Sequence, residues 1–355
     1  MQSTHIKPLT GVRFFAAAWV VLHHFHPWML MLCPALKWCD GFTKLGYEAV
    51  PFFFLLSGFI LSHNYLSDYS LAKHPRFIFL RFARLWPVHA VTLFLLILTP
   101  GMLAMNGDRL KSLVEELLMV RSWFESTAMW NAPAWSISAE WFAYIFVFPL
   151  AYFLLRRIRS AAVLAVLVTL CLAAQTSPLR NYIPNRCGAI FFLFLAGCGL
   201  YQLRRQSTKV PAVAIVNTGL ILFAAYILFN KYLSEFFLYA AFALLIFGLS
   251  YERGSLARLL STRAIVYGGL ASYSLYMTHY VIMQTYIGYT WAYWKTIPNL
   301  PLVFRLGILL FIAVVFLGAA VLSYRYVEEP ANRKLRGFWR PTKTVSAGGA
   351  VGATG

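Results

Sequence analysis

The sequence predicts an all-α, polytopic membrane protein folded as a bundle of about ten transmembrane helices. Its 355 residues are 60% hydrophobic and only 12% charged, with a mean hydropathy of +0.65. Apolar runs of about 20 residues, the length that crosses the hydrocarbon core of a bilayer, recur along the chain. No soluble domain of this size needs so much apolar surface, so the sequence excludes a soluble protein.

The apolar runs give the order of the predicted helices. The first run begins near the amino terminus with no small-residue cleavage site behind it, so we expect it to be retained. The eighth is short for a helix that crosses a membrane. The ten predicted spans lie at approximately 9–31, 46–66, 86–105, 134–155, 160–176, 187–203, 211–230, 236–250, 264–288 and 302–326.

The charge pattern indicates orientation rather than a nucleic-acid partner. The chain has 31 Lys and Arg against 12 Asp and Glu, a formal net charge of +19. About two thirds of the basic residues fall in the termini and in the loops on the same side, which is the positive-inside pattern. We therefore expect a multi-pass protein with both termini in the cytoplasm, and no nucleic-acid binding.

One membrane-embedded domain is predicted over residues 1–337, followed by a disordered tail at 338–355 that ends SAGGAVGATG. Within the domain, residues 73–87 mix Arg with large apolar residues, as an interfacial helix does. Residues 108–131 contain the amphipathic stretch LKSLVEELLMV. Neither loop is long enough to form another domain.

Arg13 and His24 lie in the first apolar run with ten residues between them. Eleven helical steps return to within roughly 20° of the starting direction, so both side chains share one face, about 16 Å apart along the axis. Ionisable groups in a membrane span are costly and indicate function. Neutral imidazole is a natural base for a hydroxyl. In the alternative, His24 only forms a hydrogen bond to another helix.

Two further clusters carry charge. Arg81 and Arg84 are three residues apart on one helix face, and paired guanidinium groups suit phosphate oxygens. The alternative is an anchor to anionic lipid headgroups. Glu140 enters an apolar helix, with Ser136 one turn before it and Tyr144 one turn after it. Such a carboxylate could orient an imidazole, hold a proton, or pair with an Arg for structure alone.

The last two spans contribute two more groups. Tyr276 and His279 fall on one helical stripe with small residues nearby. Arg325 precedes Glu328 by three residues and Glu329 by four, which predicts an ion pair within the helix and no catalytic role.

The cysteines predict little chemistry. Cys33 and Cys39 lie in the first outer loop and could form a disulfide there. The remaining three fall in or beside apolar spans, where packing is the simplest role. Neither the cysteines nor the histidines show zinc-ligand spacing, so no metal site is expected.

Taken in order, the clusters resemble the motifs of the acyltransferase-3 family of bacterial membrane O-acyltransferases, which modify cell-surface sugars. The resemblance covers about residues 8–335. The motifs are LTGVRFFAAAWVVLHHF with Arg13 and His24, FFFLLSGFI with Ser57, RFARLWP with Arg81 and Arg84, WSISAEWFAY with Trp135 and Glu140, ASYSLYMTHY with His279, and YRYVEEP.

The resemblance implies a ten-helix enzyme of the bacterial inner membrane, with no permanently bound cofactor. It takes an acyl group, usually acetyl, from cytoplasmic acyl-CoA and passes it to a glycan hydroxyl on the outer face. The family's essential histidine and its basic partner correspond to His24 and Arg13, and the donor-associated arginines to Arg81 and Arg84. Glu140 matches its carboxylate. Supporting roles are implied for Ser57, Trp135, Ser136, Tyr276 and His279.

The chain departs from the family pattern at three places. Thr10 stands before Gly11 where the family often has Asp, and His23 and His26 are additional imidazoles. No secreted SGNH-type hydrolase domain follows the last span, which favours a lipid-linked saccharide as acceptor. The sequence does not predict an oligomeric state.

The predicted mechanism places the phosphates of acetyl-CoA at Arg81 and Arg84 and makes His24 the general base toward a sugar hydroxyl. Glu140 orients His24 or balances charge. A route through acyl-histidine is the alternative chemistry. The alternative function is a transporter or flippase that uses Arg13, His24 and Glu140 as a relay or substrate site.

Overall fold

The computed structural model describes residues 5–99, 109–124, 130–183, 185–290 and 296–339. Within these ranges the regular structure is helical and no strand occurs, which confirms the all-α prediction. The helices are α1 (Lys7–Leu32), α2 (Asp40–Lys44), α3 (Ala49–Leu61), α4 (His74–Ile97), α5 (Arg109–Leu117), α6 (Arg121–Phe124), α7 (Ala134–Phe142), α8 (Phe148–Leu155), α9 (Ala161–Gln175), α10 (Gly188–Gln206), α11 (Ala212–Phe229), α12 (Glu235–Leu249), α13 (Ser255–Leu260), α14 (Arg263–Leu270), α15 (Ser272–Thr290), α16 (Leu302–Ser323) and α17 (Glu329–Phe338).

The described helices agree with a multi-pass membrane protein. Six helical segments are long and apolar enough to cross a bilayer. Helices α9 and α12 are apolar but shorter. Helix α10 occupies the predicted span 187–203, and the predicted span 264–288 is divided between α14 and α15. The six segments are Lys7–Leu32, Pro34–Leu66, Leu71–Ile97, Ala134–Leu155, Ala212–Phe229 and Leu302–Phe338.

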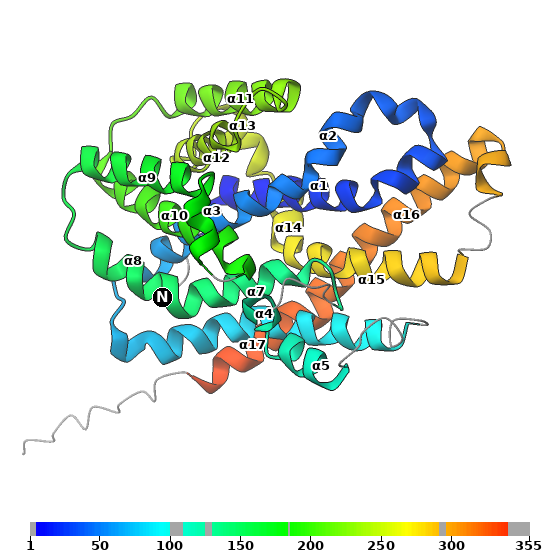
Figure 1. The fold of residues 1–355 in the computed structure, drawn as a ribbon, viewed down its shortest axis with the longest axis horizontal. Coiled ribbons are helices and arrows are strands. Elements are labelled where there is room, and N and C mark those ends of the chain that lie inside the picture. The colour runs from blue at the N-terminus through cyan, green and yellow to red at the C-terminus, as the bar shows by residue number, and fades with distance from the viewer. Residues whose placement is uncertain (1–4, 100–108, 125–129, 184, 291–295, 340–355) are drawn as a thin grey trace, which may run out of the picture.

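Helix α1 lies across the middle of the molecule (Figure 1) and contacts α3, α14, α15 and α16. The residues of α1 therefore face several other helices at once. This central place explains why a cation and an imidazole on α1 can meet partners that lie far away in the sequence.

Helix α4 differs from its prediction. An interfacial helix over 73–87 was expected to give way to a separate span at 86, but one helix runs from His74 to Ile97 with Pro87 inside it. Two residues before this proline, the Leu85 carbonyl accepts a hydrogen bond from the Tyr273 hydroxyl of α15 at 2.7 Å. The predicted end of this span, at 105, lies outside the described residues.

Helices α3 and α10 cross at unusually short range. A Cβ added to Gly58 would lie 2.1 Å from the Phe194 carbonyl oxygen, and one added to Gly197 would lie 2.0 Å from the Leu55 carbonyl oxygen. Small residues allow such backbone approach between membrane helices. The crossing fixes the position of Ser57, which is next to Gly58.

Three π-helical turns continue the long helices: η3 (Ser62–Leu66) after α3, η5 (Ala143–Val147) between α7 and α8, and η10 (Tyr324–Glu328) between α16 and α17. Such turns are rare and often occur at functional sites. Each one contains a residue of the polar network described below.

The remaining predictions concern loops, thiols and the tail. The amphipathic stretch in 108–131 forms α5, which packs on α4 through a hydrogen bond from the Trp86 indole to the Leu117 carbonyl, at 3.1 Å. Cys33 and Cys39 are free thiols in the structure, so the suggested disulfide is absent. Residues 340–355 of the predicted tail lie outside the described residues.

Candidate active site

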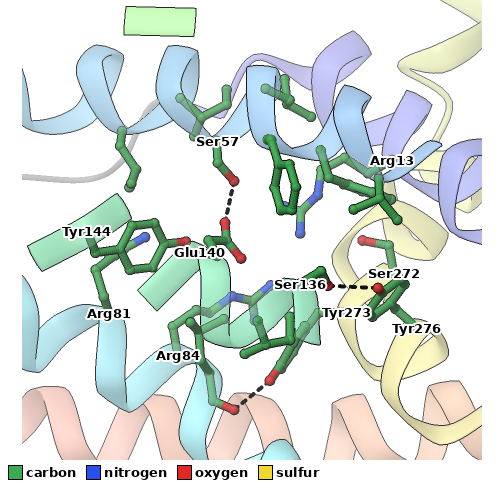
Figure 2. A pocket seen from close by; sticks show the side chains of 18 residues that line it. Arg13, Ser57, Arg81, Arg84, Ser136, Glu140, Tyr144, Ser272, Tyr273 and Tyr276 are labelled. Atoms are coloured by element: carbon green, nitrogen blue, oxygen red, sulfur yellow. Dashed lines mark hydrogen bonds between the residues drawn. The ribbon is translucent and has the colours of Figure 1, made fainter. Parts of the chain in front are cut away.

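A polar cavity of about 130 Å³ lies inside the bundle. We call it the first cavity (Figure 2). Side chains from α1, α3, α4, α7, η5 and α15 line it, and seven of the predicted site residues meet there. These seven are Arg13, Ser57, Arg81, Arg84, Ser136, Glu140 and Tyr276.

Glu140 lies between the arginines of this cavity (Figure 2). The Ser57 hydroxyl donates a hydrogen bond to Glu140 Oε1. Among the described lining residues, Glu140 is the one carboxylate facing three guanidinium groups. A low-dielectric interior favours compensation of such charge, so the structure favours the charge-balancing role over the orienting one.

The two arginines of α4 have different surroundings. Arg84 Nη1 pairs with Glu328, a carboxylate that is 1% exposed and also accepts a hydrogen bond from the Ser274 hydroxyl at 2.6 Å. Arg81 Nη2 donates to the Tyr65 hydroxyl at 2.7 Å, and its buried Nε has no hydrogen-bond partner. Arg84 therefore has a fixed counter-charge, whereas Arg81 keeps donor capacity for a ligand.

The sequence predicts an ion pair of Arg325 with Glu328 or Glu329 inside the helix, and for Glu328 this prediction is wrong. Glu328 faces Arg84, and the Arg325 guanidinium lies 5.8 Å from the centre of the Tyr326 ring instead. The prediction assumed α-helical spacing, but the segment Tyr324–Glu328 is a π-helical turn. Such a turn changes which side chains align one turn apart, so the i, i+3 pair does not form.

His24 meets His279 rather than a carboxylate. Nδ1 of His24 lies 3.0 Å from Nε2 of His279, and the rings are stacked with centroids 5.1 Å apart. His279 Nδ1 lies 3.2 Å from the Leu275 carbonyl oxygen. A carbonyl only accepts hydrogen bonds, so His279 carries its proton on Nδ1 and accepts at Nε2. His24 then donates from Nδ1, which leaves the lone pair on its own Nε2 free for a proton.

The two neighbouring histidines of α1 have other contacts. His26 is buried, with Nε2 2.9 Å from Asp40 Oδ1 and Nδ1 2.9 Å from the Thr43 hydroxyl. His23 packs edge to face on Tyr47, with ring centroids 5.4 Å apart. Neither lines a described cavity. Of the three imidazoles, His24 is the one placed for chemistry.

A second cavity of about 210 Å³ begins at His24. It also contains the predicted residue Trp135, whereas His279 contacts His24 from outside the wall. Val50 and Tyr276 line both cavities, so the two spaces adjoin. The Tyr276 hydroxyl is held there by Ser136 Oγ at 2.7 Å and the Pro133 carbonyl at 3.0 Å. The polar and aromatic wall of the second cavity consists of His24, Tyr47, Glu48, Trp135, Arg180, Glu235, Tyr239 and Tyr276.

A comparison of the whole sequence with known protein families gives the family of this chain. A family model described as an acyltransferase domain matches residues 7–324, nearly the full length of the chain. The protein belongs to the acyltransferase-3 family.

The proteins that are similar to this chain differ in sequence identity and in the length that the match covers. The chain is 35% identical over 161 residues to acyltransferase MdmB of Streptomyces mycarofaciens, covering 43% of this chain and 41% of MdmB. It is 25% identical over 378 residues to peptidoglycan O-acetyltransferase OatA of Listeria monocytogenes, covering 93% of this chain and 56% of OatA. O-acetyltransferase OatA of Staphylococcus aureus is 24% identical over 374 residues, with 93% and 58% covered.

The chain thus spans 41% of the length of MdmB and somewhat more than half the length of the two OatA relatives. No solved structure matches the chain. The family assignment therefore rests on sequence, and the roles of individual residues are argued from the site geometry.

The sequence did not predict several residues that lie at the two cavities or hold their side chains. Glu328 was assigned to a local pair, and Glu48, Arg180, Glu235 and Tyr239 of the second cavity were not singled out. Glu48 carried a signal, because it is a carboxylate inside the predicted span 46–66. Arg180 and Glu235 lie in predicted outer loops, where an isolated charge is most simply solvated.

Proposed function

We propose that this protein is a membrane O-acyltransferase that moves an acyl group, acetyl in the simplest case, from cytoplasmic acyl-CoA to a saccharide hydroxyl. The acceptor is a cell-surface or lipid-linked saccharide. The observation that carries the proposal is the free Nε2 of His24, fixed by His279 beside an arginine-lined cavity. The names of the OatA relatives, as O-acetyltransferases, support the same reaction class.

The first cavity suits the donor. The diphosphate and 3′-phosphate of coenzyme A are anions that guanidinium groups bind through charge-assisted hydrogen bonds. Arg81, with its unpartnered Nε, supplies the free donor, and Arg84 is held rigid by Glu328. The positive-inside pattern of the basic loops supports an orientation in which this end of the bundle and both termini face the cytoplasm of a bacterial inner membrane.

The two adjoining cavities bring donor and acceptor together. The long acyl arm of the donor then extends from Arg81 to His24 past Val50 and Tyr276, the side chains that line both spaces. A saccharide hydroxyl reaches His24 from the second cavity. Neither substrate then has to cross the membrane.

The chemical step follows from the His24 tautomer. His24 Nε2 takes the proton of the acceptor hydroxyl while its oxygen attacks the thioester carbonyl carbon. The carbon–sulfur bond then breaks, and the leaving sulfur takes the proton from His24. General-base help of this kind contributes about 10²- to 10⁴-fold to the rate. In the acyl-histidine route the same nitrogen attacks the thioester first. Mass spectrometry of protein incubated with acetyl-CoA alone distinguishes the routes.

The decisive test is a deletion strain complemented with variants. We expect ester-linked acetyl on the surface saccharide to disappear on deletion, to return with the wild type, and to stay absent with His24→Ala. His23→Ala is the matched control, because His23 is adjacent but lines neither described cavity. Full acetylation in cells that contain membrane-inserted His24→Ala would overturn the proposal. Membranes that consume no acetyl-CoA would favour a transporter.

A further inference from the structure

Glu48 is a buried carboxylate with an unused acceptor. It ends the short helical turn η2 (Leu45–Glu48) directly before α3, is 2% exposed, and lines the second cavity beside His24. Its Oε1 has no hydrogen-bond partner among the described residues. A buried polar atom without a partner costs free energy unless a ligand or water completes it. The free oxygen therefore marks a place where a hydrogen-bond donor belongs.

The other carboxylate of this cavity provides a contrast. Glu235, the first residue of α12, accepts a hydrogen bond from the Tyr239 hydroxyl at 3.0 Å and lies 3.8 Å from Arg180 Nη1. Its side chain is 41% exposed. Glu235 is thus satisfied by the protein and located at the rim. Glu48 is deep in the cavity. Its carboxylate interacts with the Tyr47 hydroxyl, but Oε1 has no hydrogen-bond partner among the described residues.

The lining of the second cavity is typical of a site for a hydroxyl-rich molecule. Aromatic rings of Tyr47, Trp135 and Tyr239 supply apolar walls, and a few polar groups are fixed between them. A carboxylate accepts hydrogen bonds from hydroxyl groups, and a guanidinium donates to them. Sugars present both kinds of surface, with hydroxyls at the rim of a ring whose faces are apolar.

We propose that the second cavity is the acceptor subsite, and that Glu48 accepts a hydrogen bond from a sugar hydroxyl next to the one that is acylated. This inference rests on the proposed O-acyltransferase function. Because His24 and Glu48 line the same cavity, one sugar ring presents a hydroxyl to each of them. Glu48 is then a specificity residue that binds the acceptor and takes no part in the chemical step.

The test uses the purified full chain, radiolabelled acetyl-CoA, and surface glycan from the deletion strain that has been stripped of esters with mild base. Glu48→Ala removes the acceptor atom, and Glu48→Gln keeps the shape of the side chain while removing its charge. Glu252→Gln is the control, at an exposed carboxylate that lines neither described cavity. KM is measured separately for the glycan and for acetyl-CoA.

We expect Glu48→Ala to raise the glycan KM about 10- to 100-fold, as loss of a hydrogen bond to a charged group does. Glu48→Gln should give a smaller rise, and Glu252→Gln should stay within about twofold of wild type. The KM for acetyl-CoA should be unchanged in all three, which shows that the fold is intact. An unchanged glycan KM in Glu48→Gln and Glu48→Ala would overturn the inference.

Failure of the proposed function gives a different result. In that case the wild-type protein itself transfers no label to the stripped glycan. If the wild type transfers label and the Glu48 variants match it, the function stands and the role of Glu48 is rejected. Equal rises in both KM values would also reject it, because they indicate general damage rather than loss of an acceptor contact.

Discussion

His279 fixes which nitrogen of His24 is basic, because its own Nδ1 proton is committed to the Leu275 carbonyl. In many enzymes a carboxylate holds the catalytic imidazole and stabilises its charged form. Here a neutral imidazole performs the orienting part alone. His24 is consequently oriented without a negative charge beside it.

Replacing His279 should therefore reduce turnover rather than donor binding. We expect His279→Ala to lower kcat about 100-fold, because His24 loses the acceptor that selects its tautomer, while the KM for acetyl-CoA changes little. His279→Gln, whose amide oxygen can accept from His24 Nδ1, should recover part of the loss. Steady-state kinetics on purified protein measure both. Equal losses in the two variants would contradict the orienting role.

Arg81 and Arg84 are predicted to behave differently despite their shared helix face. Arg81→Ala should raise the KM for acetyl-CoA about 10- to 100-fold with little change in kcat. The reason is that acetyl-CoA loses a guanidinium that still has unused N–H groups to bind its phosphates. Arg76→Ala, at an exposed position on the same helix, is the control. An unaltered KM in Arg81→Ala would move the donor site elsewhere.

At the scale of the helices, the short crossing of α3 and α10 determines where Ser57 meets Glu140. Gly58→Ala would push a Cβ against the backbone at Phe194, so the helices must separate. We expect this variant to lose thermal stability and activity together. Gly318→Ala on α16 is the control, since nothing lies within 4 Å of the added atom. Thermal unfolding followed by size-exclusion chromatography compares them. Equal stability of the two variants would refute the packing argument.

Helix α5, outside the predicted spans, contains a carboxyl that links stability to pH. Burial raises the pKa of Glu116 to about 8, and the nearby Arg121 guanidinium opposes this only in part. Between about pH 4.5 and 8 the folded protein binds a proton that the unfolded chain has released. Stability contributed by this group therefore falls as pH rises through that window.

The Glu116→Gln variant removes this dependence, because its amide does not titrate. We expect its melting temperature to fall less than that of the wild type between about pH 5 and pH 8.5. Glu252→Gln, which alters an exposed carboxylate that accepts from the Lys7 backbone amide and is not paired with Arg121, is the control and should keep the wild-type slope. Parallel slopes for all three proteins would show that Glu116 is ionised in the fold.

Three π-helical turns explain part of what the sequence could not predict at this scale. Tyr65 in η3 holds Arg81, Tyr144 in η5 lines the first cavity, and Glu328 in η10 holds Arg84. An α-helical template misplaces such side chains, as it did for Arg325 and Glu328. Hydrophobic runs reveal that a helix exists, but they do not reveal an extra residue within one turn.

For the molecule as a whole, the sequence predicted the helical class, the order of the spans and seven residues that line one cavity. Composition and apolar periodicity determine the helical class and the spans locally, whereas the resemblance to a known family contributed Ser57 and other members of the site. Contacts between distant helices were not predictable in the same way. The stacking of His24 on His279 and the second cavity depend on how α1 packs against α15 and the turn before α3, which no single segment encodes.

Orientation in the membrane is testable on the intact chain. We expect green fluorescent protein fused after Phe338 to be fluorescent, because that end is proposed to be cytoplasmic. Alkaline phosphatase inserted at Pro178–Tyr182, beside the second cavity, should be active because it folds outside the cytoplasm. The reverse pattern would invert the donor and acceptor sides.

The wall shared by the two cavities, at Val50 and Tyr276, has an energetic consequence. Acyl thioesters, whose hydrolysis releases free energy, are made in the cytoplasm, whereas the compartment outside has no supply of activated acyl groups. If the proposed transfer joins the two compartments at one imidazole, it delivers that free energy outward as a new ester. The proposed reaction is then vectorial: a two-carbon fragment changes compartments while its carrier stays behind, and no ion gradient is needed to drive it.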